Sequence, residues 1–139
     1  MYKKSKNWVN NLLLVTGGTG YIGSHACIAL IGAGYELLVL DNLSNSSLDS
    51  LKRVEQITSK TVSFVEGDIR DQSLLRSIFF NHSIDAVIHF SGFEGRGRVS
   101  WATFDALRNN VAGSIALLEV MAEFHCKILV FSSSGTVYG

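Results

Sequence analysis

Three glycines between Thr16 and Gly23 have the spacing of a loop that binds a dinucleotide. The segment reads Thr-Gly-Gly-Thr-Gly-Tyr-Ile-Gly and stands between a short apolar run and a helical pattern. In such loops the glycines permit a tight turn, backbone approach to a pyrophosphate and close packing of helix on strand. The N–H groups at the helix start bind the anion. A glycine-rich turn without a ligand is the alternative, whereas a P-loop is excluded because no Gly-Lys-Ser/Thr follows. The predicted cofactor-binding residues here are Gly17, Gly20, Tyr21, Ile22 and Gly23.

Asp41 ends the second apolar run and follows Gly23 by 18 residues. At this spacing a carboxylate can accept hydrogen bonds from an adenosine ribose, and it would repel a 2′-phosphate. The position therefore favours NAD over NADP, although an aspartate at a strand end can also be a simple turn or cap residue. Asn42, Asn45 and Ser46 could add to the ribose end of the site.

Two further segments follow apolar runs and could reach the same ligand. Asp68 and Ile69, in Gly-Asp-Ile-Arg, come after the third run, where Asp68 could either meet the adenine amine or cap the next helix. The fourth run leads into His-Phe-Ser-Gly at 89–92, where small residues would let a cofactor lie against the backbone. We predict that His89 is a packed residue that supports the site and is not a base.

Five apolar runs alternate with four helical patterns along the chain. The runs are typical of parallel strands covered on both faces, and they span Leu12–Thr16, Leu37–Leu40, Val62–Val65, Ala86–Phe90 and Ile128–Phe131. The helical patterns span Ile22–Ala33, Ser47–Ser59, Gln72–Asn81 and Trp101–Phe124. In the last of these, one face carries Leu107, Val111, Ile115, Leu118 and Ala122.

Strict alternation of strand and helix predicts an α/β fold with a doubly wound, Rossmann-type parallel sheet. We expect the strand order 3-2-1-4-5, with the switch point between the first and fourth strands. The glycine loop and the polar residues described above all follow strands. They are therefore expected beside the crevice at the carboxyl edge of the sheet.

Composition limits the functions that this chain can have. Its 139 residues are 47% hydrophobic and 17% charged, which fits one domain with a core and excludes intrinsic disorder. Lys plus Arg and Asp plus Glu both total 12, so no basic field indicates nucleic acid or an anionic membrane. The longest apolar run, 26–31, is far shorter than the roughly 18 to 20 residues of a membrane span. The complete lack of proline is unexplained.

Cys27 and Cys126 belong to no Cys-x-x-Cys or Cys/His ligand cluster. We expect two buried thiols, a reducing cytoplasm and no metal site. Residues 1–11 are polar and basic, and the apolar stretch behind them is too short for a signal peptide. We expect them to form a flexible extension ahead of a dinucleotide-binding domain over 12–139.

Six segments, in order and spacing, resemble the UDP-glucose 4-epimerases (UDP-galactose 4-epimerases) of the extended short-chain dehydrogenase/reductase family. They are TGGTGYIGSH, DNLSNSS, VEGDIRD, IDAVIHFSG, the triplet Asn109-Asn110-Val111 and FSSSGTVYG. The resemblance runs from about Leu12 to Gly139 and implies a tightly held NAD. In this family the NAD takes a hydride from C4 of a UDP-hexose and returns it to the opposite face of a 4-keto intermediate.

The resemblance also assigns roles to individual residues. Ser134, the third serine of its run, matches the catalytic serine that orients the sugar hydroxyl. Asn109 matches an asparagine that faces the cofactor. Phe90, Ser91 and Gly92 match the backbone on the nicotinamide side.

Departures from the family pattern lower the expected activity. The family's base, a tyrosine in a Tyr-x-x-x-Lys pair, should follow Ser134, whereas here the pattern occurs as Tyr2–Lys6, ahead of the first strand. Glu94 stands where the family has a lysine. We therefore expect an incomplete NAD-binding domain without a substrate domain and without epimerase activity on its own.

Three interpretations of function follow from the sequence: an epimerase sequence, a non-catalytic NAD-binding module, or another nucleotide-sugar enzyme such as a 4,6-dehydratase. For the fold we expect the fifth strand to be an edge strand that exposes apolar side chains around 128–131. Such a surface would favour homodimers or other self-association.

Overall fold

The computed structural model of the chain describes residues 11–92 and 101–132, apart from the side chains of 101–103. Predictions for residues 1–10, Glu94 and Ser134 lie outside this part. The described elements alternate as the sequence predicts. They are β1 (Leu12–Thr16), α1 (Tyr21–Gly32), β2 (Glu36–Asp41), α2 (Asp49–Thr58), β3 (Ser63–Glu66), α3 (Gln72–Asn81), β4 (Ala86–His89), α4 (Trp101–Glu123) and β5 (Leu129–Phe131).

The five strands form one parallel sheet in the order β3-β2-β1-β4-β5. Thr16, the last residue of the central strand, lies opposite Leu40 of β2 and His89 of β4. The chain moves outward in both directions from β1, so the switch point lies between β1 and β4. The predicted fold class and strand order are confirmed, and the predicted element boundaries agree to within two residues.

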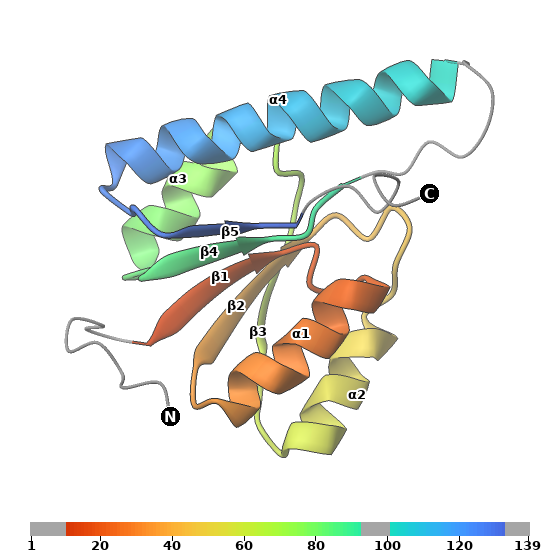
Figure 1. The fold of residues 1–139 in the computed structure, drawn as a ribbon, viewed down its shortest axis with the longest axis vertical. Coiled ribbons are helices and arrows are strands. Elements are labelled where there is room, and N and C mark those ends of the chain that lie inside the picture. The colour runs from red at the N-terminus through yellow and green to blue at the C-terminus, as the bar shows by residue number, and fades with distance from the viewer. Residues whose placement is uncertain (1–10, 93–100, 133–139) are drawn as a thin grey trace.

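Helices cover both faces of the sheet: α1 and α2 lie on one side, and α3 and α4 on the other (Figure 1). Successive side chains of a strand point to opposite faces. In β1, Leu14 joins the core beneath α3 and α4, whereas Leu13 and Val15 join the core beneath α1 and α2. Strands β1, β2 and β4 thus supply both apolar cores, which explains their continuous apolar runs in the sequence.

The sequence predicted α4 from a regularly spaced apolar face, but this is not the face that packs on the sheet. Its larger side chains, Leu107, Val111, Ile115 and Leu118, are about half exposed. The buried face carries mostly smaller or more flexible side chains, and it consists of Ala106, Ala116, Leu117, Val120 and Met121. Helix α4 is therefore apolar on two sides, one in the core and one on the surface.

Strand β5 is the last strand on its side of the sheet in the described part of the chain. Ile128, Val130 and Phe131 are all about half exposed there, as predicted for an uncovered edge. Cys27 and Cys126 are buried free thiols, also as predicted. Among the residues the structure describes, no helix has the length and apolar character needed to span a bilayer.

Candidate functional site

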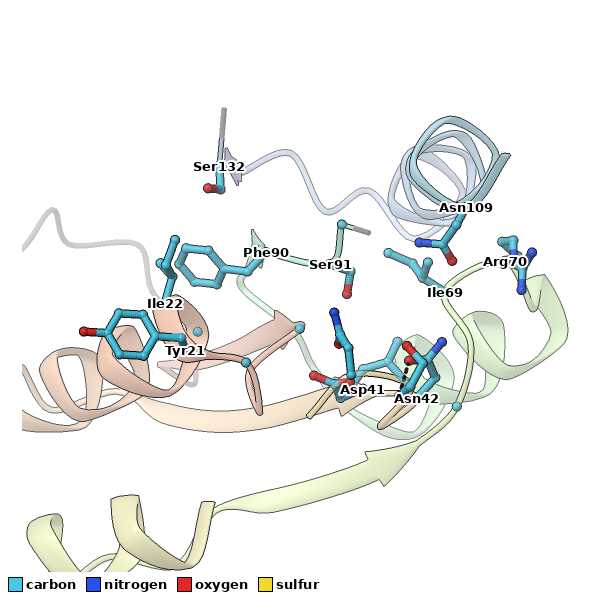
Figure 2. A pocket seen from close by; sticks show the side chains of 18 of the residues that line it. Tyr21, Ile22, Asp41, Asn42, Ile69, Arg70, Phe90, Ser91, Asn109 and Ser132 are labelled. Carbon is cyan, nitrogen blue, oxygen red and sulfur yellow. Dashed lines mark hydrogen bonds between the residues drawn. The ribbon is translucent and has the colours of Figure 1, made fainter. Parts of the chain in front are cut away.

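A cleft of about 810 Å³ opens at the carboxyl edge of the sheet. Its walls come from the segments that directly follow the five strands, together with the first turns of α1 and α4. In Figure 2, Asp41 and Asn42 line one side, Ile69, Arg70 and Asn109 enclose one end, and Ile22, Phe90 and Ser132 border the other. The volume lies within the range of about 300 to 1,000 Å³ that is typical of ligand sites.

The backbone of the glycine loop lies in close contact with neighbouring backbone. Gly17 has φ of +71°, and a Cβ atom there would lie 2.7 Å from the Ser91 nitrogen. A Cβ atom on Gly23 would lie 2.2 Å from the Gly17 oxygen. Side chains at these two positions would force the loop away from β4 or from α1. The two glycines therefore hold the floor of the cleft in place.

Helix α1 begins at this floor. Its N-cap residue is Gly20, which supplies no side chain to cap the helix. The first N–H groups of a helix have no carbonyl partner within it, and the helix dipole adds a partial positive charge at this end. Tyr21 and Ile22, in the first turn, are 83% and 62% exposed. The helix start is thus accessible to an anion in the cleft.

Asp41 is only 8% exposed, and its carboxylate is held by donors from two segments. Oδ2 accepts from the Thr19 N–H at 3.2 Å, and Oδ1 accepts from the Leu43 N–H at 3.0 Å and from the Ser46 hydroxyl at 3.4 Å. An ionised carboxylate offers about four acceptor positions. The bonded donors fix the group and leave capacity for a ligand hydroxyl.

Ser46 does not line the cleft, although the sequence places it among the ribose ligands. Its hydroxyl lies 2.6 Å from the Thr19 hydroxyl and donates to Asp41. In addition, the Ser50 hydroxyl donates to the Thr19 carbonyl at 2.8 Å. Ser46 therefore braces the glycine loop against the segment after β2, which is a supporting role.

Asp68, like Ser46, does not line the cleft. Its two oxygens accept from the Arg70 guanidinium at 2.9 and 2.6 Å. These bonds, helped by a side-chain hydrogen bond with Asn42, lower the pKa of Asp68. The alternative role as a helix cap is wrong, because Asp71 is the N-cap of α3 and accepts from the Leu74 N–H. Arg70 itself lines the cleft.

His89 is 3% exposed and fully hydrogen-bonded, as predicted for a packed histidine. Nδ1 lies 2.6 Å from the Thr16 hydroxyl, and Nε2 lies 3.0 Å from the Ser114 hydroxyl. Burial lowers the pKa of the imidazole, which favours its neutral form. In the chain, His89 directly precedes the cleft-lining segment that starts at Phe90.

Most of the predicted cofactor residues meet at this cleft. Those that line it are Gly17, Gly20, Tyr21, Ile22, Gly23, Asp41, Asn42, Asn45, Ile69, Phe90, Ser91, Gly92 and Asn109. Another six lining residues are not among the predicted cofactor residues, namely Leu40, Ser44, Gly67, Arg70, Asp105 and Ser132, although the sequence left Ser132 open as a strand-end or cofactor-side hydroxyl. Four of these directly adjoin predicted residues in the chain, and Asp105 lies one helical turn before Asn109, so strand-end position and helical spacing could have found five of them.

The sheet order, the glycine loop at the switch point and the aspartate that ends β2 define a Rossmann-type dinucleotide-binding domain. The sequence profile of the NAD dependent epimerase/dehydratase family matches residues 13–139. The chain belongs to this family, whose cofactor is NAD.

Curated relatives with similar sequences are UDP-glucose 4-epimerases. The chain is 48% identical over 127 residues to the enzyme of Bacillus subtilis and 50% identical over 127 residues to that of Yersinia pestis. Each match covers 91% of this chain and 38% of the relative. The chain thus spans less than half the length of these enzymes, and the resemblance seen in the sequence motifs is confirmed.

Solved structures give the same result. UDP-glucose 4-epimerase from Bifidobacterium longum, in complex with NAD+ and UDP, superposes with a TM-score of 0.86 at 43% identity. The match covers 92% of this chain and 38% of that structure. The enzyme from Stenotrophomonas maltophila, with bound NAD and formylated UDP-arabinopyranose, gives a TM-score of 0.85 at 42% identity, with coverage of 91% and 38%.

Proposed function

We propose that this chain binds NAD in the cleft and forms the cofactor-binding part of a UDP-glucose 4-epimerase. The observation that carries the proposal is the backbone cradle of Gly17 and Gly23, where any Cβ atom would meet other backbone, beside the start of α1. A diphosphate is the group that such a cradle accommodates.

The described residues fit the parts of NAD in order. The first turn of α1 would hold the pyrophosphate, and Asp41 would accept from the adenosine ribose. The adenine would lie between Ile69 and Asn109, at the end of the cleft that Arg70 and Asp105 border. Phe90 and Ser132 would border the nicotinamide on the other side of the switch point.

Asp41 also supports a preference for NAD over NADP. Its carboxylate is fixed by three donors and lines the cleft, where it would lie beside the ribose 2′ oxygen. A phosphate on that oxygen would meet a buried negative charge. Arg70 does not offset the effect, because its guanidinium is already paired with both oxygens of Asp68.

The proposal of an epimerase reaction rests on the relatives of this chain. NAD, when bound, supplies a hydride acceptor and donor for a sugar carbon, and the chain's residues would orient it. UDP-hexose is the proposed substrate, because the relatives at 48% to 50% identity are UDP-glucose 4-epimerases. These names favour an epimerase over a 4,6-dehydratase, although the family includes both types of enzyme.

Calorimetric titration of the 139-residue chain with NAD and with NADP tests the first part of the proposal. We expect NAD to bind more tightly than NADP and to raise the thermal midpoint more. The proposal fails if millimolar NAD neither binds nor shifts the midpoint. Substitution of Gly23 by Ala gives the matched negative control.

A non-catalytic NAD-binding module is the second candidate. The observation behind it is that the Tyr-x-x-x-Lys pattern found within these 139 residues, Tyr2–Lys6, precedes β1. An assay for turnover of UDP-galactose by the purified chain separates the two candidates. Turnover above the protein-free blank supports the epimerase, and NAD binding without turnover supports the module.

A further inference from the structure

A buried series of hydrogen bonds crosses the fold beneath one end of the cleft. It joins the Thr16 hydroxyl to His89 Nδ1 at 2.6 Å, His89 Nε2 to the Ser114 hydroxyl at 3.0 Å, and that hydroxyl to the Asn110 carbonyl at 2.6 Å. These residues come from β1, β4 and α4. Thr16 is fully buried and His89 is 3% exposed, so water does not compete for the bond between them, whereas Ser114 and Asn110 are half-buried.

The series fixes the tautomer of His89. A carbonyl oxygen only accepts, so the Ser114 hydroxyl donates its single proton to Asn110. Ser114 can then only accept from the imidazole, which places a proton on Nε2. In the neutral ring Nδ1 is an acceptor, and the Thr16 hydroxyl donates to it. The ring thus pairs with one partner as a donor and with the other as an acceptor.

The backbone and ring of His89 tie down two further segments. Its carbonyl accepts from the Ser132 N–H at 3.1 Å, and the next residue, Phe90, donates its N–H to the Thr16 carbonyl at 2.9 Å. Its ring packs against the Phe131 ring, with centroids 5.2 Å apart. One residue therefore links the ends of β1, β4 and β5 to α4.

These segments border one end of the cleft only. Asp41 ends β2, on one side of the switch point, and Phe90 and Ser132 follow β4 and β5, on the other. Figure 2 shows Phe90 and Ser132 near Ile22, away from Arg70 and Asn109. A dinucleotide that crosses the switch point with its adenosine toward Asp41 would place its nicotinamide against this end.

We propose that His89 is a positioning residue for the nicotinamide end of the cleft. The inference rests on the proposed binding of NAD. The two side-chain bonds of His89 hold the end of β4 against β1 and α4, and this sets the positions of Phe90 and Ser132, which are bonded through the backbone, so that their spacing suits the nicotinamide ring. The adenosine end is built on the segments after β2 and β3 and on Asn109 of α4, and the His89 side chain bonds directly to none of these.

Binding of NAD and of ADP-ribose, which lacks the nicotinamide, isolates this end of the site. The test variant is His89→Phe, which keeps a ring against Phe131 and removes both hydrogen bonds. His89→Gln is the conservative variant, since its amide offers one donor and one acceptor. His82→Gln is the matched control, because His82 follows α3 at the opposite edge of the sheet and does not line the cleft.

The wild-type chain is expected to bind NAD more tightly than ADP-ribose. For His89→Phe we expect a loss of about tenfold in NAD affinity, equivalent to about 1.4 kcal/mol, with ADP-ribose affinity unchanged. His89→Gln should recover part of the loss, and His82→Gln should behave like wild type. Fluorescence of bound NADH, which reports on the reduced nicotinamide, should approach that of free NADH in His89→Phe alone.

An equal loss for both ligands would overturn the inference, because it would mean that His89 supports only the fold. Unchanged affinities would overturn it as well, as would a wild-type chain that binds NAD and ADP-ribose equally. Failure of the wild type to bind either ligand is a different result and contradicts the proposed function itself. The thermal midpoint of each variant, measured alongside, shows whether it is folded.

Discussion

The backbone N–H of Thr19 donates a hydrogen bond to Oδ2 of Asp41, 22 residues further along the chain, at 3.2 Å. The carboxylate that would bind the ribose is thus also the group that fixes the glycine loop. Under the proposed binding of NAD, specificity for the ribose and the shape of the pyrophosphate site would therefore depend on one side chain.

Substitution of Asp41 by Asn should weaken NAD binding by about tenfold or more. The amide N–H₂ group of Asn would replace one carboxylate oxygen and would then face an N–H donor, either that of Thr19 or that of Leu43, which loses its acceptor. Binding of NADP should fall less, because the repulsive charge is removed. Titration calorimetry with both nucleotides checks this expectation. Asp49→Asn, at an exposed carboxylate on α2, is the control and should leave the NAD to NADP ratio unchanged. An unchanged ratio in Asp41→Asn would argue against the ribose assignment.

Substitution of Gly23 by Ala should destabilise the chain by about 2 kcal/mol or more and abolish NAD binding, because the new methyl group would overlap the Gly17 carbonyl. Gly32→Ala, in the same helix, is the matched control. A Cβ atom at Gly32 would point into open space, with no neighbouring group within 4 Å, and alanine there should stabilise by about 0.5 kcal/mol. Urea unfolding of both variants gives the comparison, and equal stabilities would contradict it.

Acid should destabilise the fold through His89. Burial lowers the pKa of His89 in the folded chain from its ordinary 6.5, so the unfolded chain binds the proton more readily. This contribution to stability is present above the unfolded pKa and is lost as the pH falls from about 6.5 toward the lowered folded value, by up to about 1.4 kcal/mol per pH unit. Urea unfolding between about pH 7.5 and 5.5 should show a steeper loss for wild type than for His89→Phe. Parallel curves would contradict the assignment.

Cys27 should resist alkylation in the folded chain. Burial raises the pKa of its thiol to about 12, and the pKa of Cys126 is raised as well. At about pH 8 only about one Cys27 in 10⁴ is then a thiolate, which is the reactive form. Mass spectrometry after iodoacetamide treatment should find Cys27 unmodified in buffer and modified in urea. Modification of Cys27 in buffer at the rate of free cysteine would show that this core opens readily.

The chain should self-associate as its concentration rises, because two apolar surfaces are exposed. One is the outer face of α4, around Ile115, and the other is the edge at β5, around Val130. Sedimentation velocity of Ile115→Lys and of Val130→Lys should show which surface dominates, since neither side chain lies in the core. A wild-type chain that stays monomeric at high concentration would contradict the expectation.

The fold could be predicted because β1, β2 and β4 are buried on both faces and the apolar runs alternate with helical patterns. The glycine loop could be identified as part of the cleft because its spacing has a steric cause. At Gly17 and Gly23 a Cβ atom would overlap neighbouring backbone. The hydrogen-bond partners of Ser46 and Asp68, which do not line the cleft, could not be predicted, because sequence position gives the end of a strand and not the partners of a side chain. Ser46 turns toward Thr19 and Asp68 toward Arg70.

The core face of α4 was harder to predict for a related reason. Its exposed stripe is more conspicuous than the stripe that packs, which is built largely from small residues and Met121. Periodicity reveals that a helix has an apolar side, but it cannot say which of two sides meets the sheet. The series through Thr16, His89 and Ser114 was equally hidden, because its members are 73 and 25 positions apart.

The cleft takes its walls from the ends of all five strands, and this has a consequence for folding. Contacts such as Thr16 with His89 span much of the chain, which gives the topology a high contact order and predicts slow folding. No partly assembled sheet contains the complete cleft. A ligand that binds there therefore stabilises the cooperative native state as a whole, and its cellular concentration would set the fraction of chains that escape proteolysis.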